Sequence, residues 1–227
     1  MSYANQLLFG IYPYICAAVF LLGSLVRFDR EQYTWRSGSS QLLRRRQLRW
    51  GSNLFHVGVL FLLFGHAVGM LTPHWAYEAF LGAGAKQMLA MVSGGLAGAL
   101  AFVGLTLLLH RRLTDPRIRA TSSKMDIAVV LLLWVQLALG LATIPFSSDH
   151  LDGSMMLVLA EWAQHVVTFR SGAADLVANV PLVFKLHMVL GMTLFLIFPF
   201  SRLVHIWSGF GTLAYLGRAY QVVRQKG

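Results

Sequence analysis

The sequence predicts an all-α membrane protein, a bundle of five transmembrane helices with its N-terminus outside and its C-terminus in the cytoplasm. Of its 227 residues, 56% are hydrophobic and only 12% are charged, whereas about a quarter of the residues of a soluble domain are charged. Five long apolar runs and a one-sided distribution of Lys and Arg complete the pattern. Lipid is therefore the expected surrounding of most of the chain.

The five apolar runs have the length needed to cross a bilayer, which is about 20 residues per helix. They are Leu7–Val26, Ser52–Leu71, Met88–Leu109, Ile127–Phe146 and Leu182–Trp207. Pro13 and Pro199 lie inside two of these runs. Because neighbouring helices satisfy the backbone groups that a proline frees, we expect kinks rather than breaks at both positions.

The basic residues set the expected orientation. Of the 19 Lys and Arg residues, all but Lys86, Arg170 and Lys185 fall in loops or chain ends on one side of the predicted bundle. Lys and Arg concentrate in cytoplasmic loops, so this side is the cytoplasmic one. We expect one membrane domain, residues 1–207, followed by a cytoplasmic tail, residues 208–227, that contacts a partner subunit.

The connection Ser147–Pro181 is the longest on the outer side and has an apolar pattern of its own. Its apolar residues recur at helical spacing, which predicts an amphipathic helix in the outer interface. They are Met155, Val158, Leu159, Trp162, Val166 and Phe169. Trp75 and Tyr77 follow the second run, where the aromatic belt of a membrane protein is expected.

The formal net charge of +10 does not indicate a nucleic-acid partner, because the basic residues stand in loops between apolar runs. Anionic lipid or an acidic protein surface is the expected partner. The single cysteine, Cys16, lies inside an apolar run. One cysteine excludes an iron–sulfur cluster built by this chain alone.

Four of the eight histidines lie inside apolar runs, where ionisable residues are costly and usually functional. His56 and His66 are in the second run, and His187 and His205 are in the fifth. These two helices run antiparallel, so His66 matches His187 in depth near the outer side. By the same reasoning, His56 matches His205 near the inner side.

The spacing along the two helices supports this pairing with one discrepancy. At about 1.5 Å per residue, His56 and His66 are about 15 Å apart, whereas His187 and His205 are about 27 Å apart. Two sites at two depths, with one imidazole from each helix, suit bis-histidine haem ligation. A metal transporter with histidines along its path is the alternative on spacing alone.

Several segments carry a resemblance to the gamma subunit of membrane-bound respiratory nitrate reductase, a dihaem cytochrome b. They are IYPYI at 11–15, QYTWR at 32–36, SNLFHVG at 52–58, GH at 65–66, GMLTPHW at 69–75, RRL at 111–113, TIPFS at 143–147, WAQHVVTF at 162–169, HMVLGMTLFL at 187–196 and FPFSRLVHIWS at 198–208. This resemblance implies two haems b with His56, His66, His187 and His205 as ligands.

The resemblance also implies that the chain takes electrons from quinol in the inner membrane of a prokaryote. It would pass them to an iron–sulfur (beta) subunit, and through it to a molybdenum-containing (alpha) subunit that reduces nitrate to nitrite. Two alternatives remain open at this point. One is a quinone-linked haem b subunit of a sulfur-metabolism complex, and the other is a non-redox membrane anchor or transporter.

Two further sets of residues are candidates. Lys86, at the start of the third run, is expected to bind quinol close to His66, where Gly65 leaves room for a flat ring. A lysine donates a hydrogen bond to a quinol oxygen or favours its deprotonated form. Arg111, Arg112 and Arg202 are expected near the inner haem, because a propionate in lipid needs a cationic partner.

Overall fold

The structure of the chain is a computed structural model that describes residues 2–35, 43, 45–149 and 151–209. In these ranges, five helical segments are long and apolar enough to cross a membrane, as predicted. They are Tyr3–Arg30, Arg45–Leu71, Ala83–Thr114, Lys124–Ser148 and Leu182–Phe200. The helices extend beyond the first four predicted runs, because polar and basic residues at their ends continue the helical backbone.

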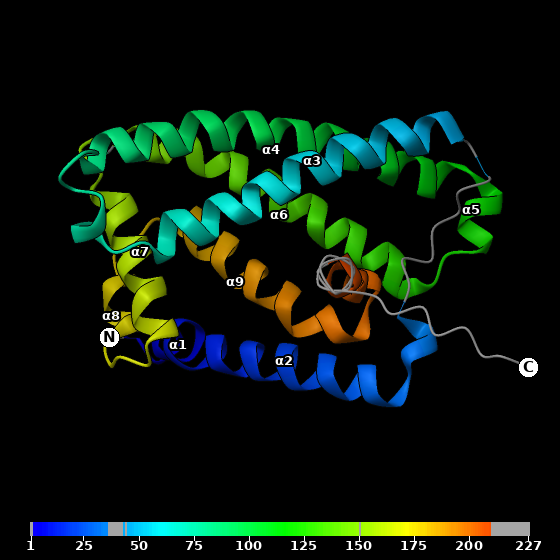
Figure 1. Ribbon diagram of the computed structural model, residues 1–227, viewed down its shortest axis with the longest axis horizontal. Coiled ribbons are helices and arrows are strands. Elements are labelled where there is room, and N and C mark those ends of the chain that lie inside the picture. Colours follow the sequence, from blue (N-terminus) through cyan, green and yellow to red (C-terminus); the bar gives the residue numbers. More distant parts are fainter. Residues whose placement is uncertain (1, 36–42, 44, 150, 210–227) are drawn as a thin grey trace, which may run out of the picture.

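The helices of the described residues follow the chain in a simple order. The first span consists of α1 (Tyr3–Gln6), a π-helical turn (Leu7–Ile11) and α2 (Tyr12–Arg30). The next spans are α3 (Arg45–Leu71), α4 (Ala83–Thr114), α6 (Lys124–Ser148) and α9 (Leu182–Ile197). The short helices α5 (Pro116–Ala120), α7 (Ser154–Val167) and α8 (Ala173–Leu176) lie between spans. Figure 1 shows α7 and α8 at one end of the bundle and α5 at the other.

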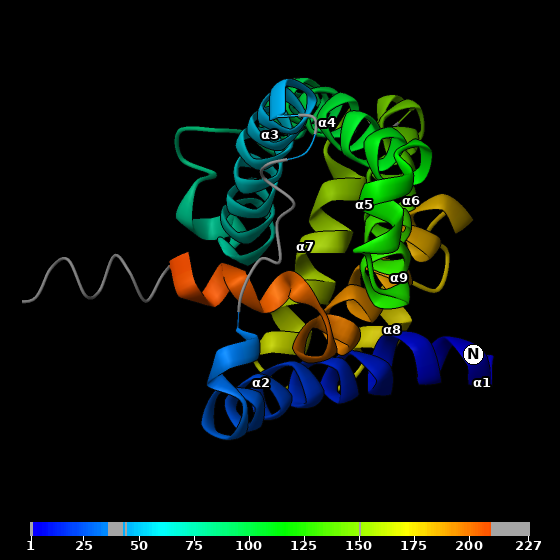
Figure 2. The ribbon, with the colours of Figure 1, turned by 90° about the vertical axis from the view of Figure 1, so that its right-hand side faces the viewer.

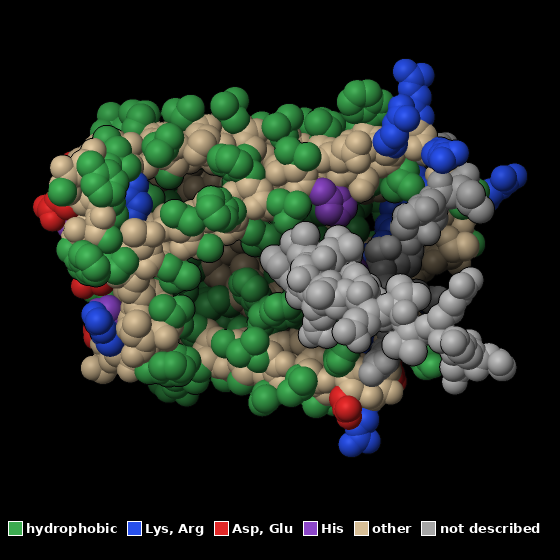
Figure 3. All heavy atoms as spheres, viewed as in Figure 1, with side chains coloured by type: hydrophobic (Ala, Val, Ile, Leu, Met, Phe, Trp, Pro, Cys, Tyr) green, Lys and Arg blue, Asp and Glu red, His purple; other side chains and the backbone are tan. Residues whose placement is uncertain are grey.

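The five spans form an open arc. Around the arc, each helix packs on the next: α3 on α4, α4 on α6, α6 on α9 and α9 on α2. The end-on view in Figure 2 shows this order. The arc places α3 and α9 on opposite sides of a central space. Figure 3 shows one face of the bundle hollowed between α3 and α2, with hydrophobic side chains in the recess.

The close approach of α3 to α4 depends on glycine. A Cβ atom on Gly58 would lie 2.5 Å from the carbonyl oxygen of Ala97 and 2.7 Å from the nitrogen of Ala101. Small residues of this kind let helix backbones touch in membranes. His56 precedes Gly58 by two residues, or about 200° around the helix, and so lies on nearly the opposite side. Packing on α4 therefore turns His56 away from α4.

The fifth span is interrupted near its end. The α-helix ends at Ile197, two 3-10 turns follow at Phe198–Phe200 and Arg202–Val204, and Ser201 between them is extended, with φ −121° and ψ 178°. Helix resumes at His205, and Figure 2 shows the resumed segment turned across the bundle end. We expected a kink at Pro199, but the α-helix breaks there.

Arg27 supplies the partners that this break requires. Its Nη1 donates to the carbonyl oxygens of Pro199 and Ser201, at 2.7 and 2.8 Å. An unpaired carbonyl in lipid would cost several kcal/mol, so the break depends on this side chain. The break also accounts for the discrepancy in histidine spacing, because the chain between His187 and His205 is not one straight helix.

The predicted helix of the longest connection is present as α7. Its apolar residues Met155, Val158, Leu159 and Val166 pack into the core with Phe9 and Cys16 of the first span and Phe184 of α9. The Trp162 indole is buried and donates to the carbonyl oxygen of Phe9 at 3.1 Å. The apolar face of this helix is therefore covered by the ends of the spans.

Candidate dihistidine metal centres

The structure brings the four membrane histidines together in the two predicted pairs. The ring centroids of His66 and His187 are 6.3 Å apart, and those of His56 and His205 are also 6.3 Å apart. The first pair lies toward the α7 end of the bundle and the second toward the α5 end. In each pair, one ring comes from the α3 side of the central space and the other from the fifth span.

This separation is the one that a single metal ion between two imidazoles requires. Two metal–nitrogen bonds of about 2.0 Å, and about 1.2 Å from each nitrogen to its ring centroid, give a linear separation of about 6.4 Å. Direct packing of two rings, or a hydrogen bond between them, does not require the same ring-centroid separation in both histidine pairs. The donor set of both sites therefore fits a bis-histidine haem.

Hydrogen bonds leave the correct nitrogen available in three of the four rings. The Nδ1 atoms of His56, His66 and His205 lie 2.7, 2.8 and 2.6 Å from the carbonyl oxygens of Ser52, Leu62 and Arg202, respectively. A carbonyl accepts only from a protonated Nδ1, so each ring keeps its Nε2 lone pair for a metal. Bonds of this kind fix the tautomer and orientation of a ligand.

The span α3 is the least covered by the rest of the chain. Only 6% of its most apolar window is buried, the smallest share among the five spans of the described residues. A Cβ atom on Gly65 would meet no described atom within 4 Å. Room for quinol at this glycine stays a prediction.

The arginines predicted to hold propionates are all withdrawn from bulk solvent. Arg111 and Arg112 are buried in α4, and Arg202 is partly buried. Arg111 donates to the carbonyl oxygen of Leu43 at 2.6 Å. Their role toward a propionate stays a prediction.

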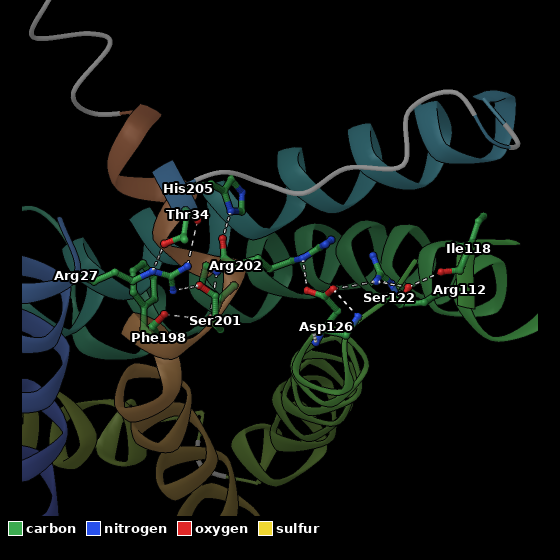
Figure 4. A network of polar contacts seen from close by, with 12 residues as sticks. Arg27, Thr34, Arg112, Ile118, Ser122, Asp126, Phe198, Ser201, Arg202 and His205 are labelled. Atoms are coloured by element: carbon green, nitrogen blue, oxygen red, sulfur yellow. Dashed lines mark hydrogen bonds and ion pairs between the residues drawn. The ribbon is translucent and has the colours of Figure 1, made fainter. Parts of the chain in front are cut away.

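Arg112 and Arg202 share one carboxylate that sequence reasoning left out of the site. Arg202 Nε donates to Asp126 Oδ1 at 2.8 Å, and Arg112 Nη1 lies 3.8 Å from Asp126 Oδ2. Figure 4 shows this cluster as part of a polar network that continues to His205, whose Nδ1 donates to the carbonyl oxygen of Arg202. Asp126 therefore anchors the peptide that orients one of the four histidines.

We expect the variant Asp126→Asn to lower the thermal stability of the purified protein strongly. Removing one partner of a fully buried ion pair costs about 3–5 kcal/mol, and the Asp126 side chain is 16% exposed, so we expect a loss at or below the lower end of that range. The control is Asp29→Asn, because Asp29 pairs with Arg30 at 3.6 Å where both side chains are largely exposed, and such pairs contribute about 0–1 kcal/mol. Equal melting temperatures for the two variants would contradict the role of Asp126.

Lys86 is buried near the start of α4. It is 9% exposed, and its Nζ has no hydrogen-bond partner in the part of the chain that the structure describes. The ammonium lies 3.6 Å from the ring centroid of Tyr77, a cation–π contact. Tyr77, expected in an aromatic belt, is itself buried, and burial raises the pKa of its hydroxyl. Trp75 is exposed, as that expectation requires.

Sequence reasoning missed Gln136, which lies beside His187. The amide Nε2 of Gln136 is 3.4 Å from the ring Nε2 of His187. A signal was available, because Gln136 is a strongly polar residue in the middle of the run Ile127–Phe146. A polar side chain in a span usually faces a partner inside the bundle.

This fold and site define a class: five-span integral membrane proteins in which facing helices present stacked histidine pairs. Within that class, residues 5–226 match the nitrate reductase gamma subunit family, and the chain belongs to this family. It is therefore a subunit of a respiratory nitrate reductase, a multi-pass protein of the bacterial inner membrane that works with other subunits.

Relatives match along the whole chain. The respiratory nitrate reductase 1 gamma chain of Escherichia coli (strain K12) is 55% identical over 226 residues, which cover 100% of both chains. The nitrate reductase gamma chain of Bacillus subtilis (strain 168) is 40% identical over 224 residues, covering 98% of this chain and 99% of that one. Family membership is consistent with haem as the group held by the histidine pairs.

Proposed function

We propose that this chain is the membrane-anchoring dihaem cytochrome b of its nitrate reductase. It oxidises quinol near the outer face and passes the electrons through two haems b to an iron–sulfur subunit on the cytoplasmic side. The observation that carries the proposal is the pair of equal 6.3 Å separations, His66 to His187 and His56 to His205. Neither a non-redox anchor nor a transporter requires this repetition.

The proposed role of each residue follows from its position. His66 and His187 hold one haem near the α7 end, and His56 and His205 hold the other near the α5 end. Haem iron accepts and donates single electrons, and the protein sets its potential and orientation. About 15 Å separates the two levels along α3, so the two haems would divide the path of the electron across the membrane.

The distribution of charge supports the proposed orientation. In Figure 3, most Lys and Arg side chains gather at the α5 end, which we assign to the cytoplasm. Arg45, Arg46 and Trp50 also border a groove of about 580 Å³ at that end. A positively charged apolar groove at the headgroup level suits an anionic phospholipid.

The same end is the proposed docking surface for the iron–sulfur subunit, and through it for the molybdenum-containing subunit. This surface comprises Arg27–Trp50, of which residues 36–42 and 44 lie outside the described residues, the loop between α4 and α6, and the tail. The predicted tail, residues 208–227, lies outside the described residues except for Ser208 and Gly209. Arg111, Arg112 and Arg202 are the proposed partners of propionates on this side.

Quinol is proposed to bind at the α7 end, beside His66 and Lys86. The buried Lys86 ammonium faces an aromatic ring and has no described hydrogen-bond acceptor. A buried cation without an acceptor gains most from a ligand oxygen, because such a bond is charge-assisted. The open space at Gly65 lies next to His66 on the neighbouring helix.

The experiment that tests the function is a reduced-minus-oxidised spectrum of the purified complex, combined with haem extraction. We expect two haems b per gamma chain, both low-spin and both reduced by quinol under anaerobic conditions. One haem per chain would remove one of the two sites. Absence of haem, with metal ions bound to the histidines, would replace the proposal by the anchor or transporter alternative.

A further inference from the structure

We propose that Gln136 is a positioning residue for the haem near the α7 end: its side-chain amide is the hydrogen-bond acceptor for Nδ1–H of His187. This inference rests on the proposed dihaem function and extends it to a residue on a third helix, α6. It assigns to Gln136 a role in setting the potential of one haem and not of the other.

The first observation is an asymmetry among the four histidines. His56, His66 and His205 each bond through Nδ1 to a backbone carbonyl three or four residues earlier in the chain. His187 makes no such bond, and its Nδ1 is buried without a partner among the described residues. An axial ligand with an unsatisfied N–H would be neither fixed in orientation nor compensated for burial. His187 therefore needs an acceptor from elsewhere.

The second observation is that one acceptor close to His187 is equally unsatisfied. Gln136 Oε1 is buried and has no hydrogen-bond partner in the described part of the chain, while the nitrogen of the same amide lies 3.4 Å from the His187 ring. Leaving a buried amide oxygen unpaired costs about 1–3 kcal/mol. One unpaired donor and one unpaired acceptor on touching side chains complement each other.

The third observation is that two glycines provide space for this contact. A Cβ atom on Gly140, one turn after Gln136 on the same face of α6, would lie 3.0 Å from Cε1 of His187. A Cβ atom on Gly191, one turn after His187 on α9, would lie 3.1 Å from Nε2 of Gln136. Side chains at either position would crowd the amide and the imidazole.

The present contact joins the amide nitrogen to Nε2 of His187, which is the nitrogen that iron takes. When Nε2 is bound to iron, it no longer accepts a hydrogen bond, and the amide nitrogen loses its role there. Rotation of the amide, with the imidazole turned in the space beside Gly140, then presents Oε1 to Nδ1–H. These two rotations together give the amide oxygen and Nδ1–H a partner.

An acceptor on Nδ1–H increases the electron density that the imidazole donates to iron, which favours the ferric state. Gln136 therefore lowers the midpoint potential of the haem on His66 and His187. The haem on His56 and His205 has its own carbonyl acceptors and does not depend on α6 at this position. The expected signature is a change in one of two haems.

The test is a potentiometric titration of the whole complex, followed by optical and electron paramagnetic resonance spectra that resolve the two haems. Gln136→Leu removes the acceptor at similar volume and is expected to raise the potential of the haem on His187 and to shift its low-spin signal. Gln136→Glu keeps an acceptor oxygen in either protonation state and is expected to hold the potential at or below the wild-type value. Val135→Ala, at the neighbouring lipid-exposed position, is the matched control.

Each outcome decides the matter. An unchanged potential in Gln136→Leu, or an equal rise in Gln136→Leu and Gln136→Glu, overturns the inference while leaving two haems in place. A shift of both haems together would indicate a general loosening of the bundle and also counts against it. A wild-type complex without two haems would instead overturn the proposed function on which the inference rests.

Discussion

The variant His66→Ala is expected to lose the haem near the α7 end and to retain the other, so that the purified complex carries one haem per gamma chain in place of two. In the proposed arrangement, His66 would supply one of the two nitrogens that hold this haem, and its ring centroid lies 6.3 Å from that of His187. Haem b has no covalent attachment to the protein, so losing an axial bond removes most of its affinity. Quinol-driven nitrate reduction should fall to the level of a heme-deficient complex.

The second haem survives because its ligands are held independently. His56 is fixed by the carbonyl oxygen of Ser52 and His205 by that of Arg202, which Asp126 in turn holds. Haem extraction and low-temperature spectra measure both effects. His110→Ala is the control, because His110 is an exposed residue near the end of α4 whose ring contacts Gln47. Two haems with unchanged spectra in His66→Ala would show that the ligands are assigned wrongly.

The fold was largely predictable because the physical requirement is simple. About 20 apolar residues are needed for a helix to cross a bilayer, and such a helix satisfies its own backbone hydrogen bonds in lipid. The five runs therefore marked the five spans, and the basic loops marked one end. The helix ends were less predictable, since residues such as Arg45 and Thr114 continue helices for reasons of hydrogen bonding that hydropathy does not register.

The histidine pairs were predictable from depth alone, whereas the means of bringing them together was not. A straight helix of eighteen residues from His187 to His205 would be longer than the distance between the two histidine levels, which ten residues set on α3. The structure resolves this through the break at Phe198–Val204. Pro199 signalled a disturbance there, but the bonds from Arg27 to the freed carbonyls link residues more than 170 positions apart.

Long-range pairings of this kind account for most of what sequence reasoning missed. Asp126 appeared to be an ordinary residue at a helix start, and it does form a capping box with Ser123. Only the folded chain shows that its carboxylate also meets Arg112 and Arg202. The position of Tyr77 over Lys86 depends on how the loop between α3 and α4 folds back. The sequence pattern does not show this fold, so it predicts an aromatic belt at Tyr77 instead.

Replacing Lys86 with alanine is expected to slow quinol-driven haem reduction by about 10- to 100-fold. A hydrogen bond to a charged group contributes about 1.5–3 kcal/mol, and each 1.4 kcal/mol corresponds to a factor of ten. The loss is expected in the step that takes electrons from quinol, because Lys86 touches neither histidine pair in the described contacts. Both haems should therefore be present with normal spectra, and an artificial donor that feeds the soluble subunits should still support nitrate reduction.

Two further variants separate this role from simple packing under Tyr77. Lys86→Met keeps the aliphatic length of the side chain and its burial but removes the charge, so it should be as defective as Lys86→Ala. Lys185→Ala removes another lysine on the same side, one whose Nζ already donates to the carbonyl oxygen of Ala178 at 2.6 Å, and it should oxidise quinol normally. Stopped-flow reduction of the haems by a quinol analogue measures all three variants. Wild-type rates in Lys86→Met would mean that the ammonium serves no quinol oxygen, and the binding site would have to lie elsewhere.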